Sequence, residues 1–200
     1  FGGFVATHTL PVEAASHPHA AFITIDDTIQ PISADFLSRA IDSATDDGAQ
    51  LLIVRLDTPG GLFSSTRDMV EDIVASDIPI VVYVAPSGAR AASAGTFITA
   101  AAHVAAMAPT TNIGAASPVA GGGEDLPETL ASKATQDAAA FIRSIAQGRG
   151  RNAKALEETV LSARSFSASE ALEADIIDLI AKDIDDLMAK LDGRAVPIKD

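Results

Sequence analysis

The sequence predicts an α/β domain in which mostly parallel strands are covered by helices on both sides. Short, nearly all-apolar runs of strand length alternate along the chain with longer segments whose apolar residues recur at helical spacing. The runs lack the polar alternation of a half-exposed sheet, which indicates burial on both faces. The 200 residues, 48% of them hydrophobic, suit one domain with a sizeable core.

The elements follow in order from residue 21. Apolar runs predict strands at 21–25, 51–56, 80–84, 104–108 and 176–180, and helical spacing predicts helices over 32–44, 66–75, 93–101, 127–147, 153–160 and 169–174. Ser33 is the expected N-cap of the first helix, and Gly148 is the expected C-cap glycine of the longest one. Residues 1–20 lack periodicity, so we expect an N-terminal arm or leader remnant followed by one domain over 21–200.

Composition excludes several kinds of function. The formal net charge of −13 argues against nucleic acid as a partner, because no basic patch is available to displace counterions. The absence of cysteine removes thiol nucleophiles, thiolate zinc sites and disulfides. We expect no metal and no cofactor.

One long stretch without charged residues resembles a membrane span at first. Residues 91–123 contain no Asp, Glu, Lys or Arg, but prolines and glycines interrupt them and Ala, Thr and Ser predominate. This composition favours a buried α/β interior over a membrane-spanning helix. The chain begins at Phe1 without an initiator Met, so we expect an upstream segment.

A glycine pair follows the second predicted strand, in residues 57–61 (DTPGG). Consecutive glycines let the backbone turn sharply and leave amide N–H groups open to a ligand, so Gly60 and Gly61 are candidate donors to an oxyanion. The alternative is an ordinary turn between a strand and a helix.

A serine surrounded by small residues opens the third predicted helix, in residues 91–95 (AASAG). Small neighbours leave Ser93 accessible, and a helix N-terminus favours developing negative charge. The alternative is a Ser93 that only caps its helix.

Together these segments resemble the Clp-protease/crotonase superfamily, and within it the membrane-bound serine protease domain of the long NfeD-type proteins. The resemblance spans roughly residues 20–192, and it is carried by residues 56–61 (LDTPGG), 91–96 (AASAGT), 106–109 (AMAP), 112–115 (NIGA) and 169–172 (SEAL). It implies a Clp-protease/crotonase-like fold, with Ser93 as nucleophile and the amides of Gly61, Gly60 and Ala94 as the oxyanion hole. Asp175 departs from the family, which commonly has glycine there, but aspartate tolerates the left-handed conformation.

The resemblance also implies the base. Clp proteases carry a histidine just ahead of a proline, and the corresponding residues 115–118 (Ala-Ala-Ser-Pro) contain no histidine. His103 is the nearest histidine to Ser93 in the sequence and is the weaker candidate for the base. NfeD-type proteases have a catalytic lysine at the helix position that Lys133 occupies, and Thr96 would either steady this lysine or be a structural hydroxyl. From position alone, Lys133 would only form an (i, i+4) ion pair with Asp137.

The function implied by the resemblance is a serine endopeptidase with a Ser93–Lys133 dyad. It would cleave hydrophobic peptide segments of membrane-associated proteins, with a stomatin-like protein as a candidate substrate. We expect a homodimer or larger homo-oligomer, and a soluble, extracytoplasmic protease domain of a membrane-associated protein. The glycine-rich loop from 119 to 128 is either a lid over the cleft or a surface loop.

Three other functions remain open. A signal-peptide peptidase also uses serine and lysine. A crotonase-type acyl-CoA enzyme uses a similar oxyanion hole, but only Asp57 offers a carboxylate beside either glycine motif. A non-catalytic scaffold could bind a peptide in a former active site.

Overall fold

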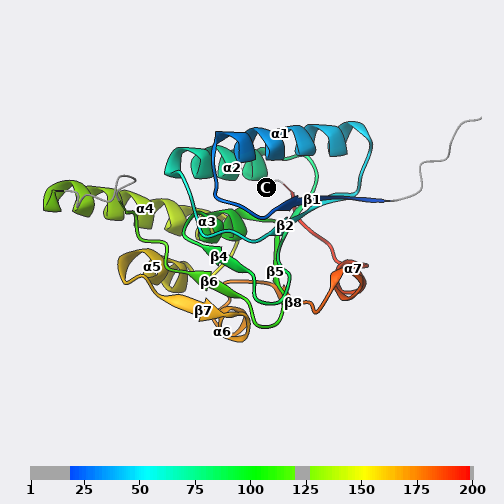
Figure 1. The fold of residues 1–200 in the computed structure, drawn as a ribbon. Helices are drawn as coiled ribbons and strands as arrows, with labels where there is room; N and C mark the ends of the chain where they lie inside the picture. The colour runs from blue at the N-terminus through cyan, green and yellow to red at the C-terminus, as the bar shows by residue number, and fades with distance from the viewer. Residues whose placement is uncertain (1–18, 120–126, 199–200) are drawn as a thin grey trace, which may run out of the picture.

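A five-stranded parallel sheet forms the centre of the computed structural model, which describes residues 19–119 and 127–198 (Figure 1). Its strand order is β1–β2–β3–β5–β8. The bounds are β1 Ala20–Ile25, β2 Leu51–Leu56, β3 Ile80–Val84, β5 Val104–Met107 and β8 Leu179–Ile180. Every residue of β3 is buried, as its uninterrupted apolar sequence requires.

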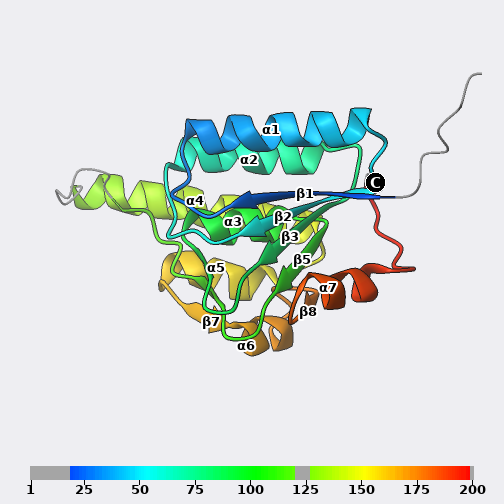
Figure 2. The ribbon, with the colours of Figure 1, turned by 45° about the vertical axis from the view of Figure 1, so that its right-hand side comes forward.

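Helices cover both faces of this sheet, as Figure 2 shows. The larger core cluster joins Leu52, Val54 and Leu56 of β2 to the helices of one face. The smaller cluster joins Ile53 and neighbouring strands to α7 on the other face. The helices are α1 Pro31–Asp46, α2 Phe63–Ala75, α3 Ala94–Ala101, α4 Glu128–Gly148, α5 Ala153–Leu161, α6 Ala168–Glu173 and α7 Ile184–Leu191.

A second, three-stranded sheet stands beside the first. Its strands are β4 Arg90–Ala92, β6 Asn112–Gly114 and β7 Ser165–Ser167, with β4 parallel and β7 antiparallel to β6. The end of β4 runs directly into Ser93, so this small sheet fixes where α3 begins.

The predicted fold class is confirmed, and most predicted elements lie within three residues of the observed ones. Residues 91–123, which resembled a span, contain β4, α3, β5 and β6 instead. Among the described residues, none of the helices has both the length and the apolarity that crossing a bilayer demands. The expected arm over residues 1–20 falls almost wholly outside the described residues, as does most of the loop from 119 to 128.

Three local predictions were wrong. Ser33 is not the N-cap of α1: Gln30 holds that position, and the Gln30 N–H donates to Ser33 Oγ at 3.3 Å. Gly148 still lies within α4, and the left-handed residue after the helix is Gly150, with φ of 65°. The last strand contains only two residues, and helix α7, which follows it, was not predicted. Asp175 does adopt the left-handed conformation, with φ of 54°.

Candidate active site

Ser93 occupies the N-cap position of α3 without acting as a cap. Its side chain makes no capping hydrogen bond, and its backbone has φ of 50° and ψ of −111°. A non-glycine residue in this region stores about 1–3 kcal/mol of strain. The capping alternative is therefore not realised, and a half-buried hydroxyl is left free for other chemistry.

Hydrogen bonds from the small sheet hold Ser93 in this strained conformation. The Ser93 N–H donates to the carbonyl of Gly114 at 3.1 Å. Thr96 Oγ1 lies one turn further along α3 and donates to the carbonyls of Ala91 at 3.0 Å and Gly114 at 3.3 Å. Of the two roles considered for Thr96, these bonds favour the structural hydroxyl over a contact with Lys133.

The glycine loop after β2 reaches Ser93 because Thr58 pairs with β4. The Thr58 N–H donates to Arg90 O at 2.8 Å, and the Ala92 N–H donates to Thr58 O at 3.1 Å. Gly60 then lies so close that a Cβ added to it would be 2.6 Å from Ser93 Cβ and 3.1 Å from Ser93 Oγ. Its φ of 118° also favours glycine. Asp57 anchors the same pairing by accepting the Arg90 N–H at 3.0 Å.

The amides around Ser93 differ in their availability. The Gly60 N–H donates to Thr58 Oγ1 at 3.1 Å, so it is already engaged. Gly61 is exposed, and within residues 19–119 and 127–198 its N–H has no backbone acceptor. Ala94 is the first residue of α3, where the amide has no partner inside the helix. Gly61 itself must be glycine, because a Cβ there would lie 2.0 Å from Ile29 O.

Lys133 lies on the second turn of α4 and is exposed. In the described part of the chain its amine makes no hydrogen bond or ion pair. The ion pair with Asp137 expected from the spacing is absent, because Asp137 Oδ2 binds Arg67 of α2 at 2.6 Å instead. Sequence reasoning missed Arg67, which precedes its partner by 70 residues.

Three phenylalanine rings join the helices that carry Ser93 and Lys133. Phe97 of α3 stacks on Phe141 of α4 with 5.7 Å between ring centroids, and Phe63 of α2 meets both rings edge-on. Phe97 follows Ser93 by one turn, and Phe141 follows Lys133 by about two turns. The cluster therefore fixes α4 against α3.

His103 lies at the wrong end of α3 to serve Ser93. The eight-residue helix separates the two, and eight residues span about 12 Å. His103 Nδ1 accepts the Ile80 N–H at 3.1 Å. Burial, reinforced by the nearby Arg149 cation, lowers the pKa of His103 to about 4. This histidine is a structural link between α3 and β3.

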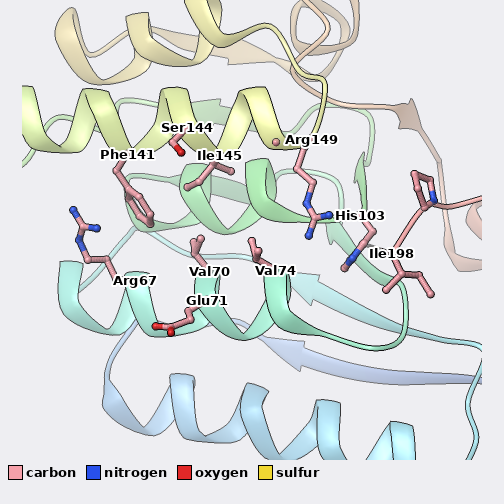
Figure 3. Close-up of a pocket in the computed structure, with 12 residues that line it drawn as sticks. Arg67, Val70, Glu71, Val74, His103, Phe141, Ser144, Ile145, Arg149 and Ile198 are labelled. Carbon is pink, nitrogen blue, oxygen red and sulfur yellow. The ribbon is translucent and has the colours of Figure 1, made fainter. Parts of the chain in front are cut away.

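A cavity of about 840 Å³ lies between α2 and α4 and includes His103, but it does not include Ser93 (Figure 3). Val70, Phe141 and Ile145 give it an apolar lining. The described residues contain no cluster of His, Asp and Glu that could hold a metal ion.

Comparison with known proteins identifies the family. The model of the NfeD1b N-terminal domain matches residues 19–199. This chain belongs to that family. It is 41% identical over 165 residues to the membrane-bound protease PH1510 of Pyrococcus horikoshii, and 40% identical over 101 residues to the membrane protein NfeD1b of Bacillus subtilis. The match to PH1510 covers 82% of this chain but 37% of PH1510. The match to NfeD1b covers 50% of this chain but 22% of NfeD1b, so the chain spans well under half the length of either relative.

Solved structures agree with this assignment. A lysine-to-alanine variant of the membrane-bound stomatin-specific protease 1510-N, in complex with a substrate peptide, superposes with a TM-score of 0.85 at 36% identity, covering 92% of this chain and 85% of that one. A serine-to-alanine variant of the same protease superposes with a TM-score of 0.84 at 36% identity, and the match covers 90% of this chain and 89% of that one. ClpP1 of Listeria monocytogenes is only 18% identical but shares the fold. It superposes with a TM-score of 0.66, and the match covers 83% of this chain and 94% of ClpP1. The NfeD domain thus has the Clp-protease-like α/β fold, and the two 1510-N structures that it resembles are those of a protease.

Proposed function

We propose that this NfeD domain is a serine endopeptidase in which Ser93 is the nucleophile and Lys133 the general base. The observation that carries the proposal is the contact of Gly60 with a strained, uncapped Ser93 at the start of α3. Strained backbone at a helix N-terminus is a recurring feature of activated serines. In this account the N–H groups of Gly61 and Ala94 bind the oxyanion, and Gly60 supplies the space that an approaching carbonyl needs.

The reaction is acyl transfer in two stages. Neutral Lys133 takes the hydroxyl proton as Ser93 Oγ attacks the peptide carbonyl carbon, and the carbonyl oxygen becomes an oxyanion held by the two amides. The ammonium of Lys133 returns the proton to the amide nitrogen as the C–N bond breaks, which releases the amine product. Water, deprotonated by Lys133, then attacks the ester carbon and restores Ser93 Oγ–H.

The choice of Lys133 is supported by the relatives. Two of the 1510-N structures have a serine and a lysine replaced by alanine, at positions 41 residues apart, against the 40 residues between Ser93 and Lys133. The described part of this chain offers no histidine near Ser93, because His103 is engaged at the far end of α3. A lysine acts as a base only when neutral, so activity should rise as pH increases.

Substrate, partners and location follow the same relatives. We propose hydrophobic segments of membrane-associated proteins, with a stomatin-like protein as the natural substrate, because 1510-N is named as specific for a stomatin homologue. A homodimer or larger homo-oligomer, and an extracytoplasmic domain in a longer membrane-associated protein, complete the proposal. Both curated relatives are named as membrane proteins.

Turnover of a fluorogenic peptide with an apolar segment tests this function. The wild-type chain should cleave it, and Ser93→Ala and Lys133→Ala should each lower kcat/KM by at least about 100-fold without a change in fold, monitored by circular dichroism. Lys154→Ala, an exposed lysine on α5, is the matched control and should retain activity. Unimpaired turnover by Lys133→Ala would refute the dyad.

A further inference from the structure

Arg67 of α2 binds the carboxylate that lies nearest in sequence to Lys133 on α4. Its guanidinium contacts Asp137 at 2.6 Å and lies over the rings of Phe141 and Phe63, with 4.2 Å and 4.8 Å to their centroids. Figure 3 shows the Arg67 side chain extending from α2 toward Phe141. Contacts on two sides therefore fix this arginine, although part of it remains exposed.

Lys133, Asp137 and Phe141 recur every four residues along α4, so they share one stripe of the helix. An unoccupied Asp137 carboxylate would lie within reach of Lys133 and would stabilise its ammonium form. The ammonium form cannot accept the proton of Ser93. Occupation of Asp137 by the Arg67 guanidinium removes this attraction.

We propose that Arg67 is a positioning residue that keeps Asp137 from pairing with Lys133 and so favours the neutral, proton-accepting lysine. This inference rests on the proposed role of Lys133 as the base. It adds to that role the residue that adjusts the charge state of Lys133. Arg67 does so through Asp137 and does not touch the substrate.

The other charges on the surrounding helices leave this pairing undisturbed. Helix α3, which packs against α4, carries no charged residue. Arg143 of α4 is paired with Glu157 of α5. Asp68, Glu71, Glu128 and Lys154 are exposed. Asp72 of α2 and Glu158 of α5 are half-buried, and Glu158 pairs with Arg164.

The test compares Arg67→Met with the wild-type chain at low ionic strength. Methionine keeps an aliphatic side chain over the phenylalanine rings but removes the cation, so Asp137 becomes free to attract Lys133. Two readouts are taken as functions of pH: kcat/KM for the peptide, and the extent of Lys133 acetylation by acetic anhydride measured by mass spectrometry. Acetylation needs the neutral amine but no catalysis, so it reports on Lys133 even in an inactive protein.

Both midpoints should move upward by a few tenths of a pH unit in Arg67→Met, and the shift should shrink at high salt. Asp137→Asn in the Arg67→Met background should return both midpoints to those of Asp137→Asn alone. A uniform loss of kcat/KM with unmoved midpoints would make Arg67 merely structural and overturn the inference. A shift that persists in the double variant would also overturn it, because Arg67 would then not act through Asp137.

The proposed function fails separately. If Lys133→Ala retains full kcat/KM, the dyad is refuted whatever Arg67 does. If Lys133→Ala is inactive while the acetylation midpoint of Arg67→Met equals that of the wild type, the dyad stands and only the role of Arg67 is lost.

Discussion

Two residues with unusual backbone conformations meet at the centre of the candidate site. Ser93 adopts a positive φ that costs energy for any residue with a side chain, and Gly60 adopts one that glycine tolerates. A Cβ on Gly60 would collide with Ser93, so the absence of a side chain there is a requirement of the site as well as of the loop.

This requirement can be tested with a matched pair of glycines. Gly60→Ala should lower kcat/KM by at least about 100-fold, because the new methyl group displaces Ser93 or blocks the carbonyl. Gly88 also has a positive φ, 91°, but nothing lies within 4 Å of the Cβ it would gain. Both variants should therefore lose about 1–2 kcal/mol in the free energy of unfolding, measured in urea. In Gly88→Ala, however, kcat/KM should stay within about twofold of the wild-type value. Equal activity of the two variants would contradict the proposed contact.

At the scale of elements, α3 is positioned from both ends. The Ser93 N–H is held by Gly114 of β6 at its start. At its other end, the buried Arg151 donates to the carbonyls of Ala100 at 3.1 Å and Ala102 at 3.0 Å and pairs with Asp178 at 2.9 Å. These bonds satisfy carbonyls that a helix terminus leaves without partners, and they limit movement of the helix that presents the serine.

His103 adds a pH dependence to the same end of α3. Its pKa is lowered to about 4 by burial and by Arg149, so its contribution to stability is fully present above the unfolded value near 6.5. As pH falls from 6.5 toward 4, the unfolded chain binds a proton that the folded chain resists, and stability is lost.

The free energy of unfolding in urea should therefore fall less between about pH 7 and about pH 4.5 in His103→Asn than in the wild type. Asparagine retains an oxygen that can accept the Ile80 N–H. An identical loss in His103→Asn and the wild type would show that His103 does not set this dependence.

The sequence predicted the elements that carry strong periodic signals and missed those that do not. Strands β2 and β3 were placed to the residue because each is a continuous apolar run ended by turn residues. The three strands of the small sheet read RAA, NIG and SFS, which are too short for any alternation to appear. The pairing of Arg67 with Asp137 was equally hidden, since it depends on how α2 and α4 pack in three dimensions.

For the whole molecule, the central question is whether the fold brings a serine and its base together. The glycine loop follows β2 of the large sheet, and the small sheet holds Ser93 beside this loop. The phenylalanine cluster packs α4 against α3. Contacts within this chain place Gly60 against Ser93. Lys133 lies on α4, which packs against the helix that Ser93 precedes.

The most direct test of this central claim is the pH dependence of Ser93 labelling by a fluorophosphonate, with the modified residue located by mass spectrometry. We expect Ser93 alone to be labelled, at a rate that rises with pH, and at a rate lower by at least about 100-fold in Lys133→Ala. Labelling of a different residue, or an unchanged rate in Lys133→Ala, would contradict the account.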